Sequence, residues 1–135
     1  MKKFNHYLSL LFTPLLLLLF TINTHSQEFR SIITVPDDYA KIQDAMDNAN
    51  TGDTVLVKEG TYFENINYKG KAITVASEFL LDGDTSHISK TIINGSQPAD
   101  SAFGSCVHFI SQETKESKLI GFTLTGGIGR FNEQF

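Results

Sequence analysis

The chain has 135 residues, a formal net charge of −4 at pH 7 and one cysteine. This length allows one domain, and the acidic balance argues against a nucleic-acid partner, because duplex binding needs basic patches that neutralise phosphates. One cysteine excludes an internal disulfide, so stability has to come from packing and backbone hydrogen bonds.

The first 26 residues have the layout of a secretory signal peptide. Lys2 and Lys3 precede an apolar run over residues 7–22, and a short polar stretch with small residues follows. The run is 16 residues long and contains a proline, whereas a membrane-spanning helix needs roughly 20 apolar residues. We therefore expect cleavage between Ser26 and Gln27, a secreted or cell-surface location and no membrane contact afterwards. Retention of the leader as an anchor is the alternative.

Residues 27–135 then form the mature domain, with nine basic and 15 acidic residues and a net charge of −6. A short strand is expected over residues 31–35. Apolar side chains recur at spacings of three and four over residues 39–50, which predicts one amphipathic helix of about three turns. Asp37 or Asp38 is expected to cap its first turn. No other helix is indicated in the mature chain.

Beyond Gly52 the pattern changes to short apolar runs separated by glycine and asparagine turns. The runs are residues 54–57, 64–68, 72–77, 91–94, 106–110 and 118–125. Several alternate between apolar and polar residues, as strands with one buried face do. An antiparallel sandwich or barrel and a β-solenoid both fit. Very short strands and a leading helix that could cover an open end favour the solenoid, although the runs are irregularly spaced.

The order of these pieces resembles the opening of the pectin-lyase-like superfamily, and most closely the N-terminal part of pectinesterase-like proteins. The residues that carry the resemblance are Ile42, Gln43, Ala45, Val55, Val57, Gly60, Tyr62, Glu64, Ile66, Ile73, Val75 and 91–95. It covers roughly residues 32–127. It implies an all-β fold, a right-handed parallel β-helix with one N-terminal capping α-helix. Residues 27–135 would then be the cap and the first coils of a domain truncated at its C-terminus.

The resemblance also implies a role with carbohydrate. In pectinesterases the catalytic carboxylates, the oxyanion-stabilising glutamine and the substrate arginine lie in later coils, beyond Phe135. No catalytic, cofactor-binding or metal-binding residue is therefore assigned in this chain, and no cofactor is expected. The first hypothesis is a secreted or cell-surface β-helix protein that binds glycan or serves as a scaffold. The alternative is the leading coils of a polysaccharide-active esterase, lyase or hydrolase. The ligand and the oligomeric state stay open.

Four residues are of types that could carry chemistry, namely Glu64, Cys106, His108 and His87. Glu64 lies in a Gly-x-Tyr-x-Glu element, where support of the fold is favoured over contact with sugar, because catalysis by carboxylates needs a partner carboxyl group about 5–9.5 Å away. Cys106 and His108 lie two residues apart on an expected strand and could form half of a metal site or a thiol–imidazole pair. Zinc needs three or four ligands, and His87 lies in a distant loop, so a structural role is favoured for both.

Three loop motifs receive structural interpretations as well. Asp82-Gly83-Asp84 lacks the ligand alternation of a calcium loop, and an ordinary turn is favoured. Asn94 matches a glycosylation acceptor, but a corner residue is the favoured role. The glycines of residues 126–129 have the wrong spacing for a dinucleotide fingerprint. The nearby lysines Lys69 and Lys71 fit a solvated turn.

Overall fold

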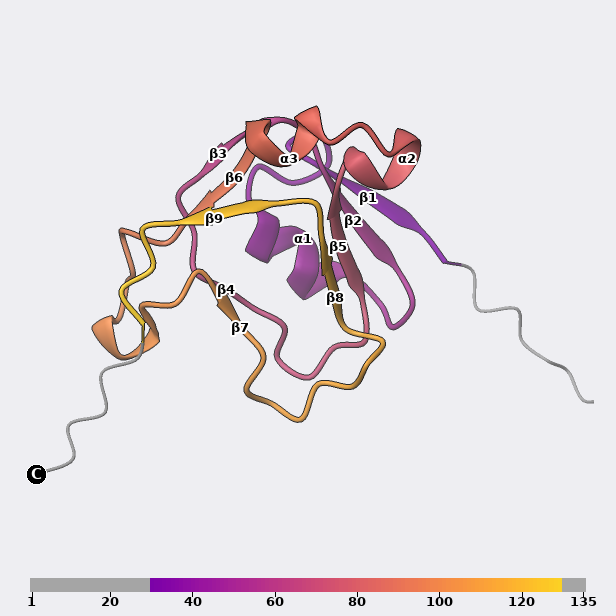
Figure 1. The fold of residues 1–135 in the computed structure, drawn as a ribbon. Helices are drawn as coiled ribbons and strands as arrows, with labels where there is room; N and C mark the ends of the chain where they lie inside the picture. The colour runs from indigo at the N-terminus through magenta and orange to yellow at the C-terminus, as the bar shows by residue number, and fades with distance from the viewer. Residues whose placement is uncertain (1–29, 130–135) are drawn as a thin grey trace, which may run out of the picture.

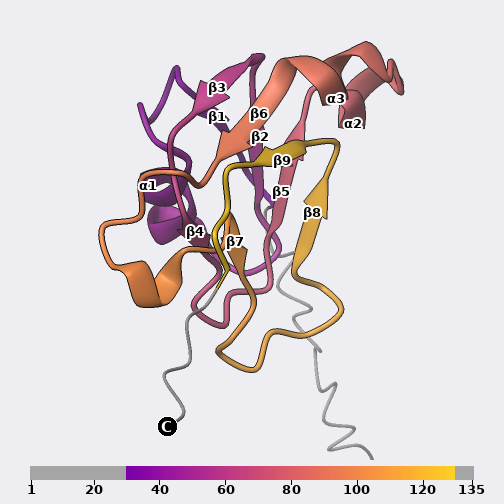
Figure 2. The same cartoon turned by 60° about the vertical axis from the view of Figure 1, so that its left-hand side comes forward.

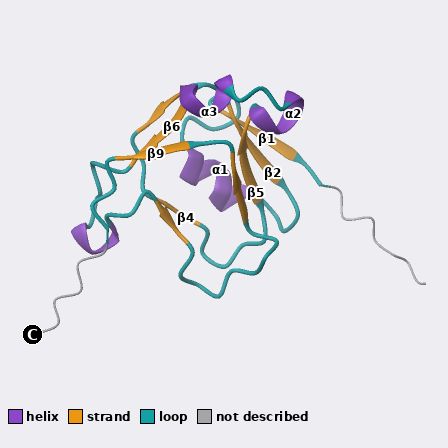
Figure 3. Ribbon diagram, viewed as in Figure 1, coloured by secondary structure: helices purple, strands orange, loops and turns teal. Residues whose placement is uncertain are grey.

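The structure is a computed structural model that describes residues 30–129. The signal peptide predicted for residues 1–26 lies outside the described residues. The elements, drawn in Figures 1 and 3, are β1 (Ile32–Val35), α1 (Ile42–Asn48), β2 (Thr54–Val57), β3 (Gly60–Tyr62), β4 (Ile66–Asn67), β5 (Thr74–Ser77), α2 (Phe79–Asp82), α3 (Ser86–Lys90), β6 (Thr91–Asn94), the 3-10 helix η1 (Ser101–Phe103), β7 (Val107–His108), β8 (Lys118–Ile120) and β9 (Thr123–Thr125).

The strands form three parallel sheets. The first has the order β1-β2-β5-β8, the second β3-β6-β9 and the third β4-β7, and Figure 2 shows the strands of the first sheet side by side. Every strand pair is parallel, with Val55 opposite Val75 in the first sheet, for example. The expectation that successive runs stack in parallel is confirmed, and the antiparallel sandwich or barrel is excluded for the described part of the chain.

The fold class expected from the sequence was wrong. The protein is a small α/β domain with parallel sheets and a few short helices, and no closed β-helix is detected over residues 30–129. Helices α2 and α3 occupy the connection between β5 and β6 (Figure 1), where no helix was expected. The three sheets are also unequal, with four, three and two strands. A solenoid stacks similar structural repeats on one another, whereas residues 78–90 carry no strand pattern and contain α2 and α3.

The three sheets and α1 share one apolar core. Its most deeply buried side chains are Val35, Ile42, Ala45, Met46, Val55, Val57, Ile66, Tyr68, Ile73, Val75 and Ile93. Burial of each large aliphatic side chain contributes about 1.5–3 kcal/mol. Tyr68 is the largest of them: its hydroxyl donates to the Lys118 carbonyl and its ring stacks on Phe109 at 4.3 Å. Burial raises the pKa of Tyr68. The core thus ties the third sheet to β8 of the first.

Helix α1 is shorter than expected and is not capped by the residues that precede it. It has seven residues, about two turns, and buries Ile42, Ala45 and Met46. The capping role expected for Asp37 or Asp38 was wrong. Asp38 accepts a hydrogen bond from the Thr34 amide at 2.7 Å, and Asp37 forms an ion pair with a lysine. The local sequence therefore does not stabilise the start of this helix.

Two polar side chains from later in the sequence bind the two ends of α1. The two carboxylate oxygens of Glu64 accept from the amides of Ile42 and Gln43, each at 2.9 Å. At the other end, Lys71 Nζ donates to the carbonyls of Met46 and Ala49 at 2.9 and 3.0 Å. Anionic groups at a helix N-terminus and cationic groups at its C-terminus complement the helix dipole. Lys71 is thus a helix cap and not part of a solvated turn.

The side chain of Gln43 joins α1 to the third sheet. Its Oε1 accepts from the Asn67 amide at 2.7 Å and its Nε2 donates to the Asn67 carbonyl at 3.2 Å. A side-chain amide bonded to both backbone groups of one residue satisfies the strand edge as a neighbouring strand would. The glutamine of the Ile-Gln pair and Glu64 are therefore structural residues that seat α1 on β4.

The buried carboxylate of Asp53 fixes the chain just before β2 begins. Asp53 is 2% exposed, and its two oxygens accept from the backbone amides of Ser31 and Asn50, each at 2.8 Å. These hydrogen bonds hold the pKa of Asp53 below its ordinary value of 3.8. The charged form is favoured because both donors point at it. Asp53 thereby links the start of β1, the end of the α1 region and the start of β2.

Candidate functional site

Two adjoining hollows lie between α1, the β4 strand and the segment that contains η1. The first has a volume of about 340 Å³ and the second about 310 Å³, and both are lined by Gln43, Asn65 and Ala99. The first is completed by Asn67, Lys69, Asp100, Phe103 and His108, and the second by Lys41, Asp44, Phe63, Glu64 and Gln97. We call the two together the α1 groove. Polar side chains and two phenylalanines make up most of its lining.

The alternation of β4 turns two amide side chains toward this groove. Asn65 and Asn67 flank the fully buried Ile66, so they lie on the opposite face of the strand. Asn65 Nδ2 donates to the carbonyls of Gly95 and Ser105 at 3.1 and 2.9 Å. Asn67 Oδ1 accepts from the Lys69 amide at 2.9 Å. Within residues 30–129 this leaves Asn65 Oδ1 as an acceptor and Asn67 Nδ2 as a donor for a ligand.

Two exposed phenylalanines lie in the lining of the groove, one in each hollow. Phe63 is 54% exposed and Phe103 is 37% exposed. The Phe103 ring meets the His108 ring edge-on at 5.6 Å, and the ring nitrogen Nε2 of His108 bonds to the Phe103 carbonyl at 3.0 Å. Asp100 Oδ1 accepts from the Ala102 amide at 2.9 Å and so starts η1. Local contacts therefore fix the position of Phe103.

The charges around the groove nearly balance. The lining contains two lysines, Lys41 and Lys69, and three carboxylates, those of Asp44, Glu64 and Asp100. Lys69 is further neutralised by an ion pair with Asp47 at 2.8 Å. The hydrogen bonds from Lys69 and Gln43 and the positive charges of Lys69 and Lys71 outweigh desolvation and lower the pKa of Asp47. Chemically, the groove offers hydrogen-bond donors and acceptors beside apolar ring surfaces, with one more carboxylate than lysines in its lining.

Glu64 has the structural role that was favoured for it. Both of its oxygens bind backbone amides of α1, so the carboxylate is committed to the helix although it also borders the groove. A general acid or nucleophile needs an oxygen free to reach the reacting atom. In this geometry both oxygens of Glu64 serve the start of α1.

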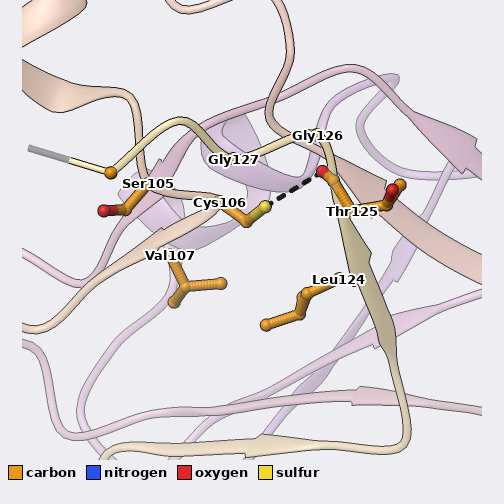
Figure 4. A pocket seen from close by; sticks show the side chains of 8 residues that line it. Ser105, Cys106, Val107, Leu124, Thr125, Gly126 and Gly127 are labelled. Atoms are coloured by element: carbon orange, nitrogen blue, oxygen red, sulfur yellow. Dashed lines mark hydrogen bonds between the residues drawn. The ribbon is translucent and has the colours of Figure 1, made fainter.

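Cys106 and His108 face different surroundings and do not form a pair. Figure 4 shows Cys106 in an open hollow of about 430 Å³ beside Val107, Leu124 and Thr125, with its Sγ donating to the Thr125 carbonyl at 3.1 Å. His108 is 5% exposed and binds the Phe103 carbonyl on the other side. The two side chains are therefore not brought together, and each binds a backbone carbonyl of a neighbouring segment.

Two of the loop motifs are ordinary turns. Asp82 Oδ1 accepts from the Asp84 amide at 2.8 Å, and Gly83 adopts the left-handed conformation that ends α2. Asn94 Oδ1 accepts from the Ser96 amide at 3.0 Å, as expected of a corner residue. Gly126 has a positive φ of 69°, and a Cβ there would lie 2.5 Å from Asn94 Oδ1. The backbone conformation at these turns therefore accounts for the residues found there.

Sequence reasoning did not find the α1 groove. From the sequence, Asn65 and Asn67 were predicted only to lie in a strand. Phe103 lies in a segment for which no helix or strand was predicted. The alternation around Ile66 was the one available signal, because it places both amides on one face. Their proximity to Phe103 depends on a loop whose course periodicity does not predict.

Among residues 30–129 there is no helix with the length and apolar character needed to cross a membrane. No family model, curated protein or solved structure matches the chain, and nothing in these comparisons identifies it with the pectin-lyase-like superfamily.

Proposed function

We propose that the protein is a secreted or cell-surface module that binds neutral oligosaccharide in the α1 groove. The observation that carries the proposal is the combination of two amide side chains with two exposed phenylalanine rings in one open groove. The secreted location rests on the signal-peptide layout of residues 1–26.

The groove suits the two surfaces of a pyranose ring. The C–H face of a sugar is apolar and packs against an aromatic ring, while its hydroxyl groups both donate and accept hydrogen bonds. Phe63 and Phe103 supply the rings. Asn65 Oδ1 and Asn67 Nδ2 supply an acceptor and a donor that lack partners among the described residues. A few placed polar groups beside aromatic surface are typical of small-molecule sites.

The charge of the groove favours a neutral glycan. Its lining contains three carboxylates and two lysines, and the whole chain has a net charge of −4. A polyuronate would bring a row of carboxylates toward an acidic protein, at an electrostatic cost that falls with salt. The groove is open and shallow, so we expect weak binding, with a Kd on the order of 1 mM or about −4 kcal/mol.

The test is isothermal titration with cellohexaose as the neutral probe and an oligogalacturonate of equal length as the anionic probe. We expect cellohexaose to bind and Phe103→Ala to weaken it about tenfold, because an aromatic contact contributes about 0.5–1.5 kcal/mol beyond its buried area. Asn67→Ala should weaken binding by a smaller factor, since it removes one hydrogen bond.

The control is Phe109→Ala, which removes a half-exposed phenylalanine that directly follows β7, stacks on Tyr68 and does not line the groove. Its affinity for cellohexaose should equal that of the wild type. Equal affinity of Phe103→Ala and the wild type, or preference for the oligogalacturonate, would contradict the proposal.

A further inference from the structure

Three side chains that can bind a metal ion, none of which lines the α1 groove, converge beside the first sheet. Glu59 follows β2, Glu78 follows β5, and His87 is the second residue of α3. One ligand atom from each lies within 4.8 Å of the others. Because β2 and β5 are adjacent and parallel, with Val57 opposite Ser77, both glutamates leave the same edge of the first sheet. Helix α3 then brings His87 over that edge.

The distances suit a first-row divalent metal ion. His87 Nδ1 lies 2.9 Å from an oxygen of Glu59 and 3.9 Å from an oxygen of Glu78. Ligand atoms around a tetrahedral Zn²⁺ with bonds of about 2.0–2.1 Å are about 3.3 Å apart, so small side-chain movements would suffice. One imidazole and two carboxylates are a donor set that favours transition metals over Ca²⁺ or Mg²⁺, which take oxygen ligands.

The second ring nitrogen of His87 is held as it is in metal sites. His87 Nε2 lies 3.2 Å from an oxygen of Asp82. A histidine ligand commonly donates its other N–H to a carboxylate, which orients the ring and makes it a better donor. When the imidazole proton is on Nε2, Nδ1 presents a lone pair to the carboxylates of Glu59 and Glu78. This arrangement is favourable only if a cation, or a second proton on Nδ1, lies between the lone pair and the carboxylates.

The local charge also favours a cation. Three carboxylates surround His87, Lys90 reaches the cluster with its Nζ 3.2 Å from Glu59, and Lys58 interacts electrostatically with Glu78. The side chain of His87 is only 17% exposed, so water screens this negative field less than at an open surface.

We propose that Glu59, Glu78 and His87 form a binding site for a Zn²⁺-like divalent ion, with Asp82 as a positioning residue. The ion would join the turn after β2, the end of β5 and α3, and so fix the α2–α3 segment on the first sheet. Lys90 is the competing cation: it occupies an oxygen of Glu59 that the metal would use.

The test is calorimetric titration of the full chain with Zn²⁺ in chelator-treated buffer, with Ca²⁺ as the comparison ion. We expect a Zn²⁺ site that His87→Ala and the double variant Glu59→Gln/Glu78→Gln both abolish. Asp82→Asn should weaken binding about 10- to 100-fold, as loss of a carboxylate behind a histidine ligand does. Lys90→Met should bind Zn²⁺ more tightly than the wild type, because it removes the competing charge.

The second measurement is thermal unfolding with and without Zn²⁺, since an ion that binds the folded state raises Tm. The wild type and Lys90→Met should shift, and His87→Ala should not. Glu116→Gln, an exposed carboxylate outside the cluster, is the matched control and should behave as the wild type. Equal Zn²⁺ affinity of the wild type and His87→Ala, in a variant whose Tm without metal shows that it folds, would overturn the proposal.

Discussion

Replacement of Asp53 by alanine is expected to lower the free energy of unfolding by about 2–4 kcal/mol. The carboxylate accepts two backbone hydrogen bonds, from Ser31 and Asn50. Both are charge-assisted, which makes them stronger than neutral ones. Alanine leaves both amides without a partner in a site that is 2% exposed. Urea denaturation followed by circular dichroism measures the change.

The same residue predicts part of the acid sensitivity of the protein. The pKa of Asp53 is lowered from its ordinary 3.8 by the two amide donors. A group whose pKa is lower in the folded state stabilises the protein above its unfolded pKa, and the contribution is lost as pH falls through the folded one. The difference in stability between the wild type and Asp53→Asn should therefore be constant above about pH 5 and shrink below pH 4.

Asp44→Asn is the matched control for Asp53. Asp44 is an exposed acidic residue of α1, so its substitution should change stability by less than about 0.5 kcal/mol. A stability difference between the wild type and Asp53→Asn that stays the same from pH 6 to pH 2 would show that the carboxylate is not held in its charged form.

The second large effect is expected at Glu64. Glu64→Ala should destabilise the protein by about 2 kcal/mol, because it removes the side-chain cap of α1 and leaves two amides of the first turn unpaired. Glu64→Gln keeps one oxygen of similar reach and should cost about 1 kcal/mol. Denaturant unfolding gives the magnitudes.

Amide hydrogen exchange locates the Glu64 effect. In Glu64→Ala the amides of Ile42 and Gln43 should exchange faster than in the wild type, while amides in the centre of β5 change only with global stability. Glu116→Gln, at an exposed carboxylate that pairs with Lys118, should leave both amides unchanged. Unaltered exchange at Ile42 and Gln43 in Glu64→Ala would mean that the carboxylate does not cap this helix.

Much of the local structure follows from the sequence. The expected runs at residues 54–57 and 91–94 coincide with β2 and β6, and the parallel pairing was anticipated. Alternating apolar residues with glycine corners are sufficient for this, because they determine which face is buried. The amphipathic spacing of residues 39–50 likewise located α1 to within three residues at its start.

The fold class and the helix cap were not predictable in the same way. Leu80 and Leu81 gave α2 no amphipathic pattern, and both are exposed, so periodicity carried no signal for it. The cap of α1 comes from Glu64, more than 20 residues downstream of the amides it binds. Sequence rules for helix caps consider only residues next to the helix. They therefore cannot predict a cap that a distant residue supplies through the tertiary fold.

The candidate sites depend on tertiary contacts even more strongly. Glu59 and His87 are 28 residues apart and meet only because β2 and β5 are neighbours and α3 folds back over them. Asn65 and Phe103 meet in the α1 groove through the course of a loop. Residue type made His87 a candidate ligand, but the sequence did not reveal its partners.

The most direct test of the proposed glycan groove is a two-dimensional NMR titration of the labelled protein with cellohexaose. We predict that the side-chain amide signals of Asn65 and Asn67 and the backbone signal of Phe103 shift together and saturate, while the signals around Cys106 stay in place. Shifts confined to another face of the molecule, or no shift at probe concentrations well above 1 mM, would contradict the account.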